Sequence, residues 1–365
     1  MRYVPLGNSG LTVSVLSFGT MTFGGTGWAA DIGRTGVDDA RRQLDICIEA
    51  GVNLIDTADI YSDGWSEEIL GEAIEPRRNE VLIATKARFP MGEGPNDGGL
   101  SRHHLIRACE ASLRRLRTDH IDLYQAHEWD GQTPIDETLA AFDHLVTQGK
   151  VRYIGLSNFT GWQFMKLMGR AQAFPNLTVA SHQVYYSLQA RESEYEIAPA
   201  AIDQGVGLMV WSPLAGGLLS GKFRRQQNLP EGARLTANWG DPPIFDEDRM
   251  FDMIEVLVEV AQSHSVSAAQ VALAWLLTRP AVATVIVGAR HEEQLRDNLA
   301  AVDLVLTPDD LARLDKASVP NLIYPYWHQA ETASDRLSAA DLSLLGPYIP
   351  WTGVRGPYAD QDPAL

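Results

Sequence analysis

The chain has 365 residues, of which 45% are hydrophobic and 21% charged, and its formal net charge is −17. This is the composition of a globular protein with room for one large or two ordinary domains. The acidic excess argues against nonspecific binding to nucleic acid or to an anionic membrane. The N-terminus lacks the apolar core of a signal peptide, no apolar run reaches the roughly 20 residues of a membrane span, and the two cysteines form no CxxC pair. We therefore expect a cytoplasmic protein without disulfides.

The first predicted element is a β-hairpin over residues 1–14, in which two short strand-like runs flank the turn Asn8-Ser9-Gly10. Eight further strand-like segments follow. Most of them are continuous apolar runs, which is typical of parallel strands buried on both faces of a sheet. These segments are 15–20, 52–58, 80–86, 121–127, 151–158, 178–187, 207–213 and 284–289.

Helical patterns separate the strands. One of them covers residues 66–75 and begins at Ser66, which we expect to cap the helix. Eight strands alternating with eight helices predict an α/β fold, the (β/α)8 TIM barrel. The alternative is a doubly wound sheet, which would normally carry a GxGxxG motif after its first strand. The sequence FGTMTFGG at that place lacks this spacing.

We expect one barrel domain over residues 1–317, with a long loop at 222–249 after the seventh strand and a helix after that loop. One more capped helix follows the last barrel helix. The remaining residues, 318–365, form an extended tail with six aromatic side chains. So many aromatic residues argue against a free disordered segment. The tail is therefore expected to pack on the barrel, over its mouth.

Polar residues stand at the carboxyl ends of the predicted strands, where barrels of this kind carry their sites. Each has a structural explanation when taken alone: Asp56 and Lys86 could form an ion pair, and His127 could be a hydrogen-bonded core residue. Seven such strand ends facing one mouth favour a functional site. The residues are Asp56 with Tyr61 in the following loop, Lys86, His127, Ser157 with Asn158, Gln183, Trp211 with Ser212, and the run Gly288-Ala289-Arg290.

The combination of Asp56, Tyr61, Lys86 and His127 suits the reduction of a carbonyl group. Hydride addition leaves an alkoxide that needs a proton, and a tyrosine can supply it if its pKa falls from about 10 toward the operating pH. A neighbouring ammonium favours the phenolate, and a carboxylate keeps that ammonium charged and in place. A histidine can hydrogen-bond the carbonyl oxygen and orient it.

Seven motifs resemble those of the aldo-keto reductase family, in the family's order: NLIDTADIYSDG, IATKA, YQAHEWD, IGLSNF, QVYYSL, VWSPLAGGLLSGK and VGARHEEQLRDN. The resemblance covers roughly residues 1–317 and is nearest to the branch that includes the potassium-channel β-subunits and bacterial NADPH-dependent relatives. It implies a catalytic tetrad of Asp56, Tyr61, Lys86 and His127. It also implies NADPH or NADP as the cofactor and a small carbonyl or alcohol compound as the substrate.

The resemblance further implies the cofactor contacts. Ser157, Asn158 and Gln183 would hydrogen-bond the nicotinamide carboxamide, and Trp211 would stack on the ring. Arg290 follows a glycine at a strand end and precedes a helix, so it can meet the 2′-phosphate of NADPH; the alternative is an arginine that pairs with surface carboxylates. The full set is Thr20, Met21, Asp56, Ser157, Asn158, Gln183 and Trp211, then Ser212, Pro213, Leu214, Gly216 and Lys222 around the pyrophosphate, and Gly288, Arg290, Gln294, Asp297 and Asn298 around the adenosine.

Aromatic residues near the predicted mouth are expected to form the walls of a substrate site. Such walls suit a flat or ring-shaped carbonyl compound or a sugar. Each of them could equally be ordinary packing. The residues are Trp28, Trp65, Phe89 and Trp129.

Other interpretations of the motifs remain. The stretch GGLLSGKF (216–223) nearly matches a Walker A loop, but Phe223 stands where the motif needs a hydroxyl. No metal site is predicted, because Gly131 stands where an HExxH motif would need its second histidine. A cofactor-sensing subunit with little turnover is a second hypothesis. A Schiff-base lyase is a third; it would need a lowered pKa at Lys86, which the adjacent Asp56 would oppose.

Overall fold

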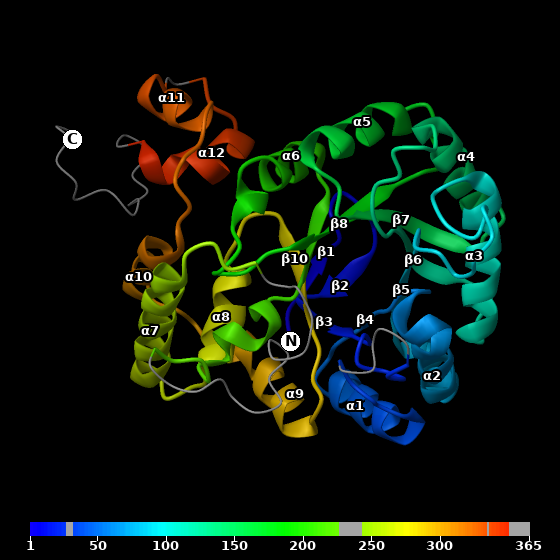
Figure 1. Cartoon of the computed structure of the whole chain (residues 1–365), viewed down its shortest axis with the longest axis horizontal. Helices are drawn as coiled ribbons and strands as arrows, with labels where there is room; N and C mark the ends of the chain where they lie inside the picture. Colours follow the sequence, from blue (N-terminus) through cyan, green and yellow to red (C-terminus); the bar gives the residue numbers. More distant parts are fainter. Residues whose placement is uncertain (27–31, 226–242, 334–335, 350–365) are drawn as a thin grey trace.

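The computed structural model describes residues 1–26, 32–225, 243–333 and 336–349. Eight parallel strands form a closed barrel in the order β10-β3-β4-β5-β6-β7-β8-β9, which confirms the predicted (β/α)8 fold (Figure 1). The strands are β3 Leu16–Gly19, β4 Leu54–Asp56, β5 Leu82–Ala87, β6 Ile121–Ala126, β7 Val151–Ser157, β8 Val179–Tyr185, β9 Gly207–Trp211 and β10 Val282–Val287.

Helices surround the strands (Figure 1). One large buried cluster contains apolar side chains of both the strands and the helices. Within the described residues, no helix has the length and apolar character that a membrane span requires. The helices around the barrel are α1 Val37–Glu49, α2 Trp65–Ile74, α3 Arg102–Arg115, α4 Ile135–Thr147, α5 Gly161–Ala171, α6 Ile197–Gln204, α8 Ala268–Leu276 and α9 Glu292–Leu299.

The start of α2 differs from the prediction. Ser66 was expected to cap this helix, but the helix begins at Trp65, and Gly64 precedes it in a left-handed conformation with φ 95°. Ser66 is instead fully buried, and its hydroxyl donates to the carbonyl oxygen of Thr20 at 2.9 Å. The prediction of a cap at Ser66 is therefore wrong, because its side chain bonds to the neighbouring loop rather than to its own helix.

The N-terminal hairpin closes the amino end of the barrel. Its strands, β1 Tyr3–Pro5 and β2 Thr12–Ser14, pair antiparallel as predicted. Leu6 in the turn between them packs with Leu54, Leu123 and other residues inside the barrel. Gly7 has φ 58°, and a Cβ atom there would lie 2.6 Å from the carbonyl oxygen of Gly205, so only glycine fits this approach.

The insertion after β9 carries a helix, α7 Glu247–Ser263, which begins a few residues earlier than the predicted loop 222–249 allows. Asp246 caps it by accepting a hydrogen bond from the backbone of Arg249. Residues 226–242 of the predicted loop lie outside the described residues. Helix α10 Pro308–Ser318 then follows α9 and packs against α7.

The described part of the tail packs on the outside of the barrel. Its helices α11 Tyr326–Glu331 and α12 Ala339–Leu345 lie beyond α6 and α10, and α12 packs against α6 (Figure 1). Leu344, Leu345 and Ile349 form a small buried cluster of their own with Tyr195 and Tyr326. Residues 350–365, which hold Trp351 and Tyr358, lie outside the described residues.

Because the tail has its own apolar cluster, it should come loose without unfolding the barrel. Leu345 is 2% exposed, and we expect Leu345→Ala to weaken tail docking by about 2–5 kcal/mol, the usual loss for a buried leucine. Limited proteolysis should then cut the tail faster than in the wild type, while the melting temperature of the barrel stays near its wild-type value. Ile323→Ala, on an exposed side chain of the same segment, is the matched control. Equal proteolysis of both variants would contradict the separate docking of the tail.

Candidate active site

A cavity of about 1290 Å³ opens at the carboxyl end of the barrel. This volume exceeds the roughly 300–1,000 Å³ of ordinary small-molecule pockets, so the cavity is large enough for an extended ligand. Residues from the ends of β4, β6, β7, β8, β9 and β10 line it, together with residues of the following loops. None of the described tail residues line it. The expectation that the tail covers the mouth therefore does not hold for residues 318–333 and 336–349.

Asp56 and Lys86 form a buried ion pair at one side of the cavity. Lys86 is fully buried, and its ammonium donates to Oδ2 of Asp56 at 2.7 Å and to the backbone oxygen of Thr57 at 2.8 Å. The other oxygen of Asp56 accepts from Nε2 of Gln183 at 2.8 Å. Gln125, opposite Lys86 on β6, also reaches this oxygen at 3.5 Å. The carboxylate that follows the apolar run Asn-Leu-Ile is thus fully paired.

The third donor direction of Lys86 leads to Tyr61. The ammonium of Lys86 lies 3.4 Å from the hydroxyl oxygen of Tyr61 and 5.1 Å from the centre of the Tyr61 ring. Burial by itself lowers the pKa of Lys86, but the Asp56 carboxylate and the Tyr61 hydroxyl raise that pKa above its usual value. Lys86 therefore stays charged at neutral pH, next to the phenol.

Tyr61 begins a turn with an unusual backbone. Ser62, Asp63 and Gly64 follow it with φ values of 50°, 57° and 95°, all in the left-handed region. A non-glycine residue in a sparsely populated region costs on the order of 1–3 kcal/mol. Two such residues in succession are not a local preference of the chain, so tertiary contacts must hold this turn.

His127 faces Tyr61 from β6. The two rings meet edge to face with centroids 5.9 Å apart, and Phe89 contacts the other side of His127 at 4.8 Å. Burial lowers the pKa of His127 well below its usual value, and the charges of Lys86 and Arg88 add to this effect. The imidazole is therefore neutral. Within the described residues its Nδ1 atom is buried and has no hydrogen-bond partner.

Asn158 connects three strand ends across the mouth. Its amide nitrogen donates to the backbone oxygen of His127, and its amide oxygen accepts from the indole of Trp211, both at 3.1 Å. The Trp211 ring stacks on Tyr185 with centroids 4.8 Å apart. These contacts fix the indole face at the edge of the cavity, where it can support a planar ring.

Ser157 offers an unused hydrogen-bonding group to the cavity. It lies opposite Gln183 in the register of β7 and β8 and is 1% exposed. Among the described residues its hydroxyl oxygen has no hydrogen-bond partner. An unsatisfied buried hydroxyl costs about 1–3 kcal/mol, so this position fits a ligand that brings an amide or another polar group.

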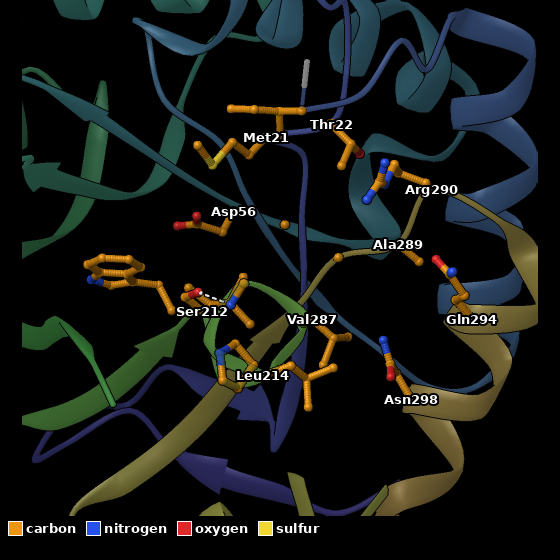
Figure 2. A pocket seen from close by; sticks show the side chains of 18 of the residues that line it. Met21, Thr22, Asp56, Ser212, Leu214, Val287, Ala289, Arg290, Gln294 and Asn298 are labelled. Carbon is orange, nitrogen blue, oxygen red and sulfur yellow. Dashed lines mark hydrogen bonds between the residues drawn. The ribbon is translucent and has the colours of Figure 1, made fainter. Parts of the chain in front are cut away.

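The far end of the cavity is formed by α9 and the loop before it. Arg290 lies beside Thr22, and the amides of Gln294 and Asn298 face the same space from α9 (Figure 2). Asp297 also lines the cavity, but its carboxylate accepts hydrogen bonds from Ser267 and Gln270 of the neighbouring helix, both at 2.6 Å. Asp297 therefore joins α8 to α9 at this end.

The loop after β9 crosses between the two ends. Ser212, Ala215, Gly216 and Gly217 all have positive φ, and the backbone amide of Gly216 donates to the Ser212 hydroxyl at 3.3 Å (Figure 2). Such left-handed turns direct backbone amides outward and form concave sites for anions. Pro213, Leu214 and Lys222 line the cavity along this loop.

Besides Lys86, four residues predicted for the site do not line this cavity or cannot be placed. Thr20 is buried behind it and contacts Ser66 at 2.8 Å. Trp65 is 54% exposed at the start of α2. Trp129 packs edge to face on Phe159 and Trp162. Trp28 lies outside the described residues. The other predicted residues line the cavity, except Lys86, which lies beneath it.

Several lining or supporting residues were not predicted. Gln125 stands two residues before His127 on β6, and the two-residue period of a strand could have placed both on the inner face. Ile60, Thr22 and Pro90 line the cavity next to predicted residues. No sequence signal distinguishes them, because their exposure to the cavity depends on loop conformation.

The fold and the site define a (β/α)8-barrel protein with polar strand ends around a large cavity. The sequence profile of the aldo/keto reductase family matches residues 15–319. The chain therefore belongs to the aldo/keto reductase family, as its motifs predicted, and is an oxidoreductase of that family. Nicotinamide cofactors are general in this family.

Relatives include both enzymes and channel subunits. The uncharacterized oxidoreductase YrpG of Bacillus subtilis (strain 168) is 40% identical over 327 residues, which cover 86% of this chain and 95% of the relative. A probable voltage-gated potassium channel subunit beta of Arabidopsis thaliana is 36% identical over 87% of this chain and 96% of its own length. The versiconal hemiacetal acetate reductase of Aspergillus parasiticus is 34% identical over 89% of this chain and 99% of its own length. The bacterial oxidoreductase and the channel subunit match the predicted branch.

A buried histidine of β8, which packs against Phe164 of α5, should make stability depend on pH. His182 is fully buried and accepts a hydrogen bond from the backbone of Phe159, and burial lowers its pKa to about 3. The unfolded chain takes up this proton below about pH 6.5 while the folded chain does not, so stability is lost as pH falls, by about 1.4 kcal/mol per unit.

His182→Gln keeps an acceptor for Phe159 but does not titrate. Urea unfolding at about pH 6 and about pH 5 should therefore show a pH slope that is shallower than wild type by about 1.4 kcal/mol per unit. His328→Gln replaces an exposed histidine and should keep the wild-type slope. An unchanged slope in His182→Gln would show that His182 takes up its proton in the folded state.

Proposed function

We propose that this protein is an NADP(H)-dependent oxidoreductase that transfers hydride between nicotinamide and a carbonyl or alcohol substrate, with Tyr61 as general acid and base. The observation that carries the proposal is the position of Lys86. Its ammonium is buried, is fixed by Asp56 and Thr57, and reaches the Tyr61 hydroxyl at 3.4 Å. An ammonium held beside a phenol at a cavity edge is what proton transfer from that phenol requires.

In the reducing direction, Tyr61 gives its proton to the carbonyl oxygen when hydride reaches the carbonyl carbon. The carbon–oxygen double bond becomes single, and the electron pair on oxygen takes the phenolic proton. The phenolate left behind lies next to the charged Lys86, which stabilises it. In the oxidising direction the same phenolate takes the proton back from the alcohol.

His127 is suited to orient the substrate rather than to donate the proton. Its imidazole is neutral because burial and two nearby cations lower its pKa. A neutral imidazole can donate a hydrogen bond to the carbonyl oxygen and still carry no charge that competes with the Tyr61–Lys86 pair. Phe89, which packs on His127 and lines the cavity, is our candidate for a substrate wall. The substrate wall formed by Trp28, Trp65 and Trp129 stays a prediction.

The cofactor assignment is supported by the cavity lining. When bound, NADPH supplies the hydride and NADP accepts it. Ser157, Asn158 and Gln183 would hold the nicotinamide amide. The Ser157 hydroxyl, which has no hydrogen-bond partner among the described residues, fits this role. Trp211 would support the ring. The loop from Ser212 to Lys222 would hold the pyrophosphate, and Met21, Gly288, Arg290, Gln294, Asp297 and Asn298 would surround the remainder, with Thr20 behind them.

The raised pKa of Lys86 argues against a Schiff-base lyase. Such an enzyme needs an uncharged amine as its nucleophile. The Asp56 carboxylate and the Tyr61 hydroxyl instead favour the ammonium.

A second candidate is a cofactor-sensing subunit with little turnover. One observation favours it: a probable voltage-gated potassium channel subunit beta of Arabidopsis thaliana is 36% identical over 87% of this chain. Steady-state oxidation of NADPH with a panel of reactive aldehydes separates the two. Sustained turnover supports the enzyme, and tight NADPH binding without turnover supports the sensor.

Removing the Tyr61 hydroxyl tests the assignment of the acid. We expect Tyr61→Phe to lower turnover by about 10²–10⁴-fold, the usual contribution of a general acid, and to leave NADPH binding nearly unchanged. Tyr3→Phe removes an exposed hydroxyl from the hairpin at the other end of the barrel and should have wild-type turnover. The assignment is wrong if Tyr61→Phe keeps wild-type turnover under conditions where chemistry limits the rate.

Replacing Arg290 tests the preference for NADPH. A charge-assisted contact to phosphate contributes about 1.5–3 kcal/mol, so Arg290→Ala should weaken NADPH binding roughly tenfold to a hundredfold. NADH lacks the 2′-phosphate, so its affinity should hardly change. Fluorescence titration of both cofactors measures this, and the loss should shrink as salt rises.

The matched control is Arg296→Ala, which removes an exposed arginine of α9 that does not line the cavity. It should leave both affinities unchanged. An equal loss of NADPH and NADH affinity in Arg290→Ala would mean that Arg290 shapes the loop rather than recognises the phosphate. A wild-type protein that prefers NADH would contradict the assignment of the cofactor.

A further inference from the structure

The turn that begins with Tyr61 is joined to the loop after β3 through the side chain and the backbone of Ser62. This side chain is fully buried. Its hydroxyl donates to the backbone oxygen of Phe23 at 2.7 Å and accepts from the backbone amide of Gly25 at 3.0 Å. The backbone oxygen of Ser62 in turn accepts from the hydroxyl of Thr26 at 2.9 Å. Three hydrogen bonds therefore join one residue of the turn to residues 23–26.

The two segments are also in close contact at Gly24. A Cβ atom on Gly24 would lie 2.8 Å from Cβ of Ser62 and 3.1 Å from Cβ of Trp65. Gly24 itself has φ 88°, a value that favours glycine. The backbone of residues 23–26 thus lies directly against the left-handed turn, and the polar atoms of Ser62 are satisfied by this segment.

The contact between Tyr61 and Lys86 depends on where this turn lies. Two bonds of 2.7 Å and 2.8 Å fix the Lys86 ammonium to Asp56 and to Thr57. Its contact to the Tyr61 hydroxyl is longer, at 3.4 Å. Lys86 cannot move toward the phenol without loss of the shorter bonds. The position of Tyr61 therefore decides whether the third contact forms.

We propose that Ser62 is a positioning residue, which holds the Tyr61 turn against residues 23–26 and thereby sets the contact between the Tyr61 hydroxyl and Lys86. The expected effect of Ser62 on catalysis rests on the proposed role of Tyr61 as the general acid. The same loop carries Met21 and Thr22, which line the cavity. Ser62 thus connects a wall of the cofactor cavity to the tyrosine turn. The groups that face Tyr61 are Lys86 from β5 and the neutral His127 from β6, with Asp56 behind Lys86.

Two variants test this role. Ser62→Ala removes both side-chain hydrogen bonds. Ser62→Gly removes them too, but glycine adopts φ 50° without strain, so this variant keeps the turn folded if alanine destabilises it. In both we expect turnover to fall by about 10- to 100-fold, the loss that small misplacements of a reacting group cause. The Michaelis constant of the carbonyl substrate should hardly change. The alkaline limb of the profile of turnover against pH should shift to higher pH.

A second readout needs no turnover. Ultraviolet difference absorbance follows ionisation of the phenol, and subtraction of the matching Tyr61→Phe background isolates Tyr61. Because an ammonium near a phenol lowers its pKa, a phenol that has moved away from Lys86 should ionise at higher pH in both Ser62 variants. The proposal is overturned if, in both Ser62 variants, the Tyr61 phenol ionises at the same pH as in the wild type and turnover is unchanged.

Ser318→Ala is the matched control for stability. Ser318 is also a buried serine that donates to a backbone oxygen at 2.7 Å and accepts from an N–H group at 2.8 Å, but it lies far from the cavity in α10. It should lower the melting temperature and leave the phenol titration and turnover unchanged. If the wild-type protein reduces no carbonyl compound, the proposed function fails, while the phenol titration still decides the role of Ser62.

Discussion

The ammonium of Lys86 and the carboxylate of Asp56 are both removed from water, and either charge alone would be costly there. They are stable only as a pair, 2.7 Å apart, with Thr57 and Gln183 satisfying the remaining directions. This requirement determines the residues around the pair. Gln125 and Gln183 must present amides inward from β6 and β8, and Tyr61 must stand where the last donor direction of Lys86 leads. The arrangement of the site therefore depends on the buried ion pair of Asp56 and Lys86.

Two aspartates of one short stretch show how strongly surroundings decide chemical state. Asp56 accepts hydrogen bonds from Lys86 and Gln183. Asp59, three residues later, is also buried, yet among the described residues neither of its carboxyl oxygens has a hydrogen-bond partner. Burial raises the pKa of Asp59 well above its usual value, and the nearby Glu67 adds to this effect. Burial thus favours the neutral form of Asp59, whereas the carboxylate of Asp56 is paired with the Lys86 ammonium, although the stretch DTAD shows no difference between them.

The predictions that failed all concern segments whose position depends on contacts distant in sequence. Ser66 has the sequence of a helix cap, but Thr20 and Thr57 surround its hydroxyl and take its hydrogen bonds. The aromatic tail was expected over the mouth, but its described part packs on α6 because Tyr195 and Tyr326 stack there. An aromatic residue can pack against a helix or line a cavity, so the composition of a segment does not tell where its aromatic residues lie.

The sequence by itself determined the barrel, because continuous apolar runs alternating with amphipathic helices have few other stable arrangements. It also determined that Asp56, Lys86, His127, Ser157 and Gln183 meet, because the carboxyl ends of parallel strands in a barrel lie on one rim. Only the tertiary structure decided which side chains pair and which stay free to meet a ligand. Among the described residues the Ser157 hydroxyl has no hydrogen-bond partner, whereas Asp297 joins two helices and Ser62 joins two loops. Hydrogen bonds act over about 3 Å, so these pairings depend on loop positions that the pattern of apolar residues does not specify.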